Sequence, residues 1–343
     1  MFKNRLFYIL ISALISIALL WLLFSQIKTE DIISTISRIY IPTLVAYMAV
    51  ALIAAWLRAW RYKLLLKPQP ISWGNIFLVT FIRNSLIDLL PARLGSLSYI
   101  YVLNKRLNFP FETATSSFVL AFFLDFLTLS PFLIVAVIAV GLGTTTISTP
   151  ALLLISLAFF IFIFFVLWKI IPLSQFLLMI YERVLHASKS ENKRLAKISI
   201  EKFQLTIDSL SQIHQRKIYF PVVLLSFLIR LAKYISVYAL FFSLLRSQGF
   251  LLSELSFWKF ILGISGAELT SALPIKGLAG FGTWESAWAL TLRLMNFDSR
   301  LAIISGIGVH LLTNIFEYSL GIASIFILAW PYLGKLRTKN DQF

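Results

Sequence analysis

The chain has 343 residues, of which 59% are hydrophobic and 13% charged, and its mean hydropathy is +0.86. A soluble domain of this length could not bury so much apolar surface in one core, so the composition excludes a soluble globular protein and predicts a polytopic membrane protein. Topology largely explains the net charge of +16, and nucleic acid is not an expected partner. Without Cys the chain has no disulfide framework or thiolate chemistry.

Apolar runs long enough to cross about 30 Å of hydrocarbon as helices recur along the chain. The first, over residues 6–25, follows Lys3 and Arg5 as in a signal peptide, but it is too long and lacks a clear cleavage site. We expect a retained signal anchor with a cytoplasmic N-terminus. Further spans are expected over 41–66, 111–141, 149–171, 218–245 and 301–330, and hairpins over 72–107 and 255–295. This layout leaves most Lys and Arg residues, and both termini, on the cytoplasmic side.

A Leu-Pro-x-(Arg/Lys) phrase occurs twice at membrane depth, ending at Arg93 in the first hairpin and at Lys276 in the second. Each copy follows a mostly apolar stretch and is followed by Gly and more apolar residues, so each breaks a membrane segment and places a cation at the break. Broken helices repeated in two halves of a membrane protein typically mark a transport site.

Treating both hairpins as re-entrant makes the two halves comparable. Repeat one, about 41–141, and repeat two, about 218–330, each hold a span, a hairpin and a span. The first hairpin would open inward and the second outward, as in an inverted-topology repeat. The sequence therefore predicts an all-α polytopic integral membrane protein with a single transmembrane domain over residues 1–343. We expect two inverted repeats, each with a broken or re-entrant helical hairpin.

A second echo links the halves. Arg58 and Arg61 in the first half match Arg230 and Lys233 in the second, and the spacing of three puts both cations of a pair on one helix face.

The connector over residues 172–217 is basic, with eight Lys and Arg residues against four acids. Its later part has apolar residues at helical spacing: Ile200, Phe203, Ile207, Leu210 and Ile213. This pattern predicts an amphipathic cytoplasmic helix that lies on anionic headgroups of the membrane surface.

These residues resemble the transmembrane, flippase-like region of bacterial lysylphosphatidylglycerol synthases and its stand-alone relatives, over nearly the whole chain. The shared marks are Arg58-x-x-Arg61, Asn84 with Leu90-Pro91-x-Arg93-x-Gly95, and Pro274 with Gly280-x-Gly282-x-x-Glu285. The chain departs from that pattern at Ser96, where an acid is common, at Ala279, where Gly is usual, and near Tyr99, where an Arg is expected. The synthase domain is absent from the sequence, so the resemblance implies lipid handling without aminoacyl transfer.

Intramembrane ions cost at least about 2.5 kcal/mol each, so they are candidates for function. Cations just past helix breaks suit a lipid phosphate, because helix ends and a planar guanidinium both favour phosphate oxygens. We expect a basic cavity for an anionic headgroup. Its candidate residues are Arg58, Arg61, Arg83, Asn84, Pro91, Arg93, Gly95, Arg230, Lys233, Pro274, Lys276, Gly280, Gly282 and Glu285.

Structural roles compete with this hypothesis. Arg58, Arg61 and Lys63 could snorkel to the inner interface. Acids in the membrane segments could neutralise buried cations: Asp88, Asp125, Glu268, Glu285 and Glu317. Ion pairing or a coupling proton is considered for Glu285, Glu317 and Asp125. His310, Asn314 and Glu317 share one helix face, where a lone His is more often a packing residue than a metal ligand.

The favoured function is translocation of an anionic phospholipid or lipid-linked intermediate across the cytoplasmic membrane of a prokaryote. The sequence shows no nucleotide-binding loop, so movement would be downhill or ion-coupled. A membrane-embedded lipid-modifying enzyme and a non-transporting accessory protein of lipid or cell-envelope biosynthesis stay open as alternatives. Anionic membrane lipids are the expected partners, and no cofactor or metal is expected.

Overall fold

The computed structural model describes residue 14 and residues 16–87, 95–141, 149–188, 194–270 and 277–340, with only the backbone for Leu278 and residues 331–340. Every regular element in these ranges is helical. Residues 6–13 and 15 of the signal anchor expected over 6–25 lie outside the described residues, and residues 16–24 are helical.

Five helices in the described ranges are long and apolar enough to cross a membrane, judged by length and composition. They are α3 (Ile41–Leu65), α6 (Phe111–Gly141), α7 (Thr149–Trp168), α10 (Tyr219–Arg246) and α13 (Ser299–Asn340). Even the shortest has 20 residues, which span about 30 Å at 1.5 Å per residue. These helices agree with the expected spans to within about three residues, except that α13 continues ten residues beyond the expected end at 330.

Each predicted hairpin region consists of two short helices. The first region holds α4 (Trp73–Leu86) and α5 (Ser98–Arg106), and the second holds α11 (Phe257–Thr270) and α12 (Thr283–Leu294). A 14-residue helix such as α4 is about 21 Å long, too short to cross the hydrocarbon core. Both Leu-Pro motifs fall within residues 88–94 and 271–276, which lie outside the described residues. The predicted Asp88, Pro91, Arg93, Pro274 and Lys276 therefore lie there too.

Local sequence fixes the ends of these short helices. The Ser72 hydroxyl accepts the Asn75 N–H at 3.2 Å and caps the start of α4. Beyond the end of α4, a Cβ on Gly95 would fall onto the carbonyl oxygen of Leu86, so only glycine permits this close return of the backbone.

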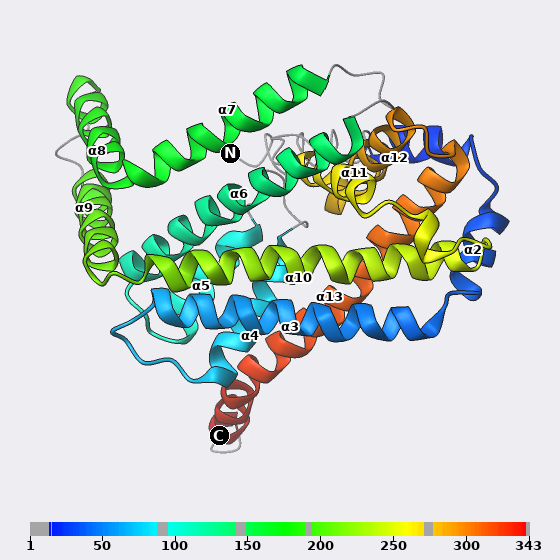
Figure 1. Cartoon of the computed structure of the whole chain (residues 1–343). Helices are drawn as coiled ribbons and strands as arrows, with labels where there is room; N and C mark the ends of the chain where they lie inside the picture. Colours follow the sequence, from blue (N-terminus) through cyan, green and yellow to red (C-terminus); the bar gives the residue numbers. More distant parts are fainter. Residues whose placement is uncertain are drawn as a thin grey trace.

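In the described part of the chain, the long helices pack side by side around two large apolar cores and a small third one between α3 and α10. In Figure 1, α3 and α10 run antiparallel against each other along the long axis of the molecule. α4 packs on α13, and α11 packs on α6. Trp288, fully buried, lies against Phe241 and Phe260 in one core, and Tyr62 lies against Tyr99 in the other.

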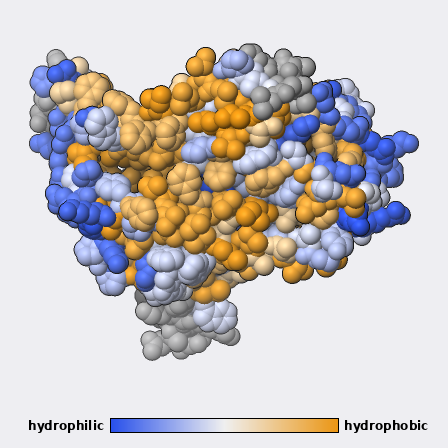
Figure 2. Space-filling model, viewed as in Figure 1, coloured by the Kyte–Doolittle hydropathy of each residue, from blue (hydrophilic) through white to orange (hydrophobic). Residues whose placement is uncertain are grey.

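Two polar ends flank an apolar middle. Figure 2 shows hydrophobic surface across the centre of the molecule and hydrophilic surface at both ends of its long axis. α8 (Ile170–Ala187) and α9 (Arg194–Gln215) lie crosswise at one end, and α2 (Thr29–Ser37) lies at the other (Figure 1). The axis of α3 and α10 is therefore the direction in which the protein spans a membrane.

The apolar face of α9, which we expected on lipid headgroups, is largely covered by α6. Ile207, Leu210 and Ile213 are buried, and Ser209 hydrogen-bonds Ser116 of α6 at 2.7 Å. The neighbouring α8 has the exposed apolar face instead, at helical spacing: Phe176, Leu177, Ile180 and Val184. Contact of the connector with the membrane surface stays a prediction, and α8 is the helix suited to it.

Candidate functional site

A cavity of about 140 Å³ lies between helices of both halves of the chain. Its walls come from α3, α4, α10, α11, α12 and α13. The polar residues that line it are Tyr47, Arg58, Arg83, Asn84, Lys233, Ser236, Glu268, His310, Thr313, Asn314 and Glu317. Such a volume holds several waters or one phosphate-sized group, but not a whole lipid.

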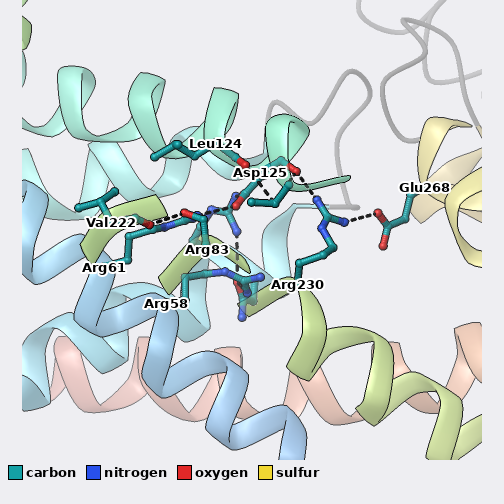
Figure 3. A network of polar contacts seen from close by, with 11 residues as sticks. Arg58, Arg61, Arg83, Leu124, Asp125, Val222, Arg230 and Glu268 are labelled. Atoms are coloured by element: carbon teal, nitrogen blue, oxygen red, sulfur yellow. Dashed lines mark hydrogen bonds and ion pairs between the residues drawn. The ribbon is translucent and has the colours of Figure 1, made fainter. Parts of the chain in front are cut away.

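Asp125 of α6 ties three other helices together (Figure 3). Its Oδ1 accepts a hydrogen bond from Arg61 of α3 at 2.7 Å, its Oδ2 is 3.8 Å from Nη2 of Arg83 in α4, and its backbone oxygen accepts from Arg230 of α10. Arg61 is fully buried and also donates to Ser226 at 2.9 Å. The alternative that Arg61 snorkels to the interface is therefore wrong, because its guanidinium lies inside the bundle.

Arg58 lies one helical turn before Arg61 and has a different environment. Its Nη1 donates to Oδ1 of Asn84 at 2.9 Å, and Arg83 donates to the same oxygen at 3.3 Å. No carboxylate of the described residues lies within 4.0 Å of Arg58. The Nε atoms of Arg58 and Arg83 have no hydrogen-bond partner. A neutral amide thus joins two cations at the cavity wall and leaves the Arg58 charge uncompensated there.

In the second half, Glu268 of α11 pairs with Arg230 and Lys233 of α10. Its Oε2 accepts from Arg230 at 2.9 Å, and its Oε1 lies 2.7 Å from Nζ of Lys233. Glu268 is nearly buried, whereas the Lys233 side chain is 39% exposed and lines the cavity. The prediction that Asp125 and Glu268 neutralise intramembrane cations is confirmed.

Among the described residues, cations outnumber acids at this site. The cations in or beside the cavity are Arg58, Arg61, Arg83, Arg230 and Lys233, and the acids are Asp125, Glu268, Glu317 and, behind His310, Glu285. Removing charges from water is costly unless they are paired, so the surplus favours an anion in the cavity.

A separate buried pair borders the cavity at the start of α12. Nδ1 of His310 lies 2.6 Å from Oε1 of Glu285, and Oε2 of Glu285 accepts the Gly282 N–H at 2.8 Å. Glu285 is fully buried, and the imidazole stacks on Trp284 at 4.8 Å. Glu285 therefore caps α12 and orients His310, a role that the Gly-x-x-Glu spacing could have signalled.

The other described residues that the sequence singled out are explained by backbone conformation or packing. Gly280 and Gly282 have φ of 82° and 85°, which suits glycine, and Ala279 between α11 and α12 has φ of 52°, also in the left-handed region. Tyr99 is fully buried, and its hydroxyl lies 3.0 Å from Ser117 Oγ. In the part of the chain that the structure describes, no group of three or more His, Asp or Glu side chains could hold a metal ion.

The fold and the buried ions define a polytopic helical membrane protein with a charged internal cavity. Residues 9–321 match the family model of the lysylphosphatidylglycerol synthase TM region, and since this match covers most of the chain, the chain belongs to that family. The resemblance expected from the motifs is thereby confirmed. Membership places the protein among membrane proteins related to lipid biosynthesis or transport. A comparison with curated proteins found no match.

Proposed function

We propose that the protein translocates an anionic phospholipid, or a lipid-linked anionic intermediate, between the leaflets of the cytoplasmic membrane of a prokaryote. The observation that carries this proposal is the cavity, where cations outnumber acids and buried N–H groups lack partners. Nε of Arg58, Nε of Arg83 and Nδ2 of Asn314 have no hydrogen-bond acceptor. Asn314 is only 5% exposed, so water does not readily satisfy its amide. Each unsatisfied buried donor costs about 1–3 kcal/mol, so turning these side chains toward an acceptor-rich anion in the cavity would be favourable.

A lipid phosphate fits this chemistry. It supplies negative charge and several acceptor oxygens, and an arginine fork can grip two of them at once. The cavity is large enough for such a headgroup, while the acyl chains would remain in the bilayer against the apolar flanks of the protein.

Helix packing supports an architecture of two inverted repeats. If α3 to α6 correspond to α10 to α13, then α3 packs on its own counterpart, α10, and the contact of α4 with α13 mirrors that of α11 with α6. The hydrogen bond from Arg58 to Asn84 likewise mirrors that from Arg230 to Glu268, both at 2.9 Å. α4 and α5 lie toward the end with α9, and α11 and α12 toward the end with α2 (Figure 1). These features favour re-entrant hairpins that open on opposite sides, with the basic connector on the cytoplasmic side.

The test is lipid movement in proteoliposomes. Fluorescent phosphatidylglycerol would be incorporated symmetrically, and a membrane-impermeant quencher would report how fast inner-leaflet lipid reaches the outer leaflet. We expect wild-type protein to accelerate movement, and the double variant Arg58→Gln/Arg83→Gln to be at least about tenfold slower, since a hydrogen bond to a charged group contributes about 1.5–3 kcal/mol.

Arg38→Gln is the matched control, because Arg38 is exposed at the end of α2, remote from the residues that line the cavity. It should move lipid at the wild-type rate. Wild-type protein no faster than empty vesicles would refute translocation, and a fully active double variant would refute the assigned site. Anionic lipid that is retained by the purified protein but never moved would favour an accessory role.

A further inference from the structure

The pair of Glu285 and His310 has features that capping of α12 does not require. The carboxylate is fully buried and the imidazole is 4% exposed, yet the imidazole lines the cavity while Glu285 lies behind it. A carboxylate that only caps a helix needs no histidine at 2.6 Å.

The geometry distinguishes the two ring nitrogens of His310. Nδ1 faces Glu285, and because an ionised carboxylate only accepts hydrogen bonds, we assign the hydrogen of the neutral ring to Nδ1. Nε2 then carries a lone pair and has no partner. Gly280 leaves room beside this atom, since a Cβ there would lie 3.6 Å from Nε2 and 3.4 Å from Cε1.

We propose that His310 is a proton-binding site that couples protonation to occupancy of the cavity by an anionic headgroup. The neutral ring adds no charge to the cavity wall. When a proton from water binds Nε2, the imidazolium places a positive charge beside the cavity, and Glu285 stabilises it through Nδ1. The inference rests on the proposed function and adds to it the co-transported ion.

Other titratable groups surround the cavity and belong to the same balance. They are Tyr47 and Arg58 on α3, Arg83 on α4, Lys233 on α10, Glu268 on α11, Glu285 on α12 and Glu317 on α13 itself. Among these side-chain types, histidine is the one whose ordinary pKa lies nearest neutrality. One proton added with a singly charged phosphate leaves the net charge of the site unchanged, which makes the carried unit electrically neutral.

Linkage gives a quantitative expectation. If protonation of His310 strengthens binding of the anion by some factor, then the anion favours protonation of His310 by the same factor. A tenfold coupling corresponds to about 1.4 kcal/mol, the scale of one charge-assisted hydrogen bond.

The experiment is ¹⁵N NMR of histidine-labelled wild-type protein in nanodiscs. The chain has three His residues, and the His310 signal is the one that His310→Gln removes. The protonated fraction of each His would be measured near pH 6.5 in phosphatidylcholine discs and in discs that also contain phosphatidylglycerol. His186 and His214 are exposed on α8 and α9, so they report the general effect of an anionic surface.

We expect phosphatidylglycerol to raise the ratio of protonated to neutral His310 about tenfold more than the ratios of the two surface His residues. The Arg58→Gln/Arg83→Gln variant should abolish this excess. An excess of zero in wild-type protein would overturn the inference, and if lipid still moves in the vesicle assay, the proposed function would stand without it. A clear excess without lipid movement would leave His310 as a proton-linked part of an anion receptor and refute translocation.

Discussion

The two halves of the molecule place a pair of cations in similar positions but give the first cation of each pair a different acceptor. In each half, a long central helix carries two cations three residues apart, and the preceding cation donates to the last turn of the short helix that follows. In the second half that acceptor is Glu268, a carboxylate that Arg230 and Lys233 share. In the first half it is Asn84, an amide without charge.

Under the proposed function, this difference indicates which half of the cavity would hold the anion. Asp125 pairs with Arg61 at 2.7 Å, whereas Arg58 donates to the neutral amide of Asn84, and Arg83 donates to the same oxygen. A carboxylate neutralises a buried cation and so stabilises the fold, whereas an amide leaves the cation's charge available to a bound anion. Under the proposed function, the first half would therefore attract an anion more strongly than the second.

The largest effect on stability is expected from breaking the ion pair between Asp125 and Arg61. Asp125→Asn leaves the fully buried Arg61 without its carboxylate and should lower the free energy of unfolding by about 3–5 kcal/mol. Denaturant unfolding in detergent, followed by circular dichroism, measures this loss. Glu112→Gln is the control, since its pair with the 43% exposed Lys202 is worth about 0–1 kcal/mol. Equal losses in the two variants would contradict the structural role of Asp125.

Making the halves alike should damage binding more than folding. Asn84→Asp places a carboxylate between Arg58 and Arg83, as Glu268 stands between Arg230 and Lys233. We expect the retention of anionic lipid, measured by native mass spectrometry, to fall by at least about tenfold, because the new charge satisfies the two guanidinium groups. Asn84→Gln keeps the group neutral and is the comparison. Unchanged retention in Asn84→Asp would show that the first half does not hold the lipid.

A smaller effect is expected at the turn before α12. Ala279 adopts φ of 52°, a conformation that costs about 1 kcal/mol for a residue with a Cβ and little for glycine. Ala279→Gly should therefore raise the free energy of unfolding by up to about 1 kcal/mol. Thermal unfolding of the purified variant checks this, and a lower melting temperature would argue against the left-handed turn.

The smallest effect concerns the polar end away from the cavity. A hydrogen bond from Arg300 to Asp31, 3.0 Å from Nε to Oδ2, holds the pKa of Asp31 below its ordinary value of 3.8. Stability from a lowered carboxyl pKa is present above that ordinary value and is lost as the pH falls through the lowered one. The small excess in melting temperature of wild type over Asp31→Asn should therefore hold at pH 7 and disappear in strong acid. An excess that persists in strong acid would exclude this pair as its source.

Much of the fold can be predicted from the sequence. An unsatisfied backbone polar group in lipid is costly, so a long apolar segment that crosses the membrane has to form a helix. The positions of the spans and the break in each hairpin region are of this kind. The spacing of Arg58 and Arg61 predicts a shared face, but not that one guanidinium would meet Asp125, 64 residues away, and the other only an amide. The amphipathic pattern of α9 likewise predicts an apolar face without saying that α6 covers it. Such pairings depend on how helices pack, which periodicity alone does not specify.

Short helices also set the width of the barrier that a polar headgroup must cross. α5 has nine residues and α12 has twelve, about 14 and 18 Å of helix against roughly 30 Å of hydrocarbon. In the proposed re-entrant hairpins, the ends of these helices lie at depths where an ordinary bilayer offers only acyl chains, and they bring backbone dipoles and charged side chains there. A headgroup held among them would have less than the full thickness of hydrocarbon ahead of it, so the protein would thin the apolar layer as well as bind the lipid.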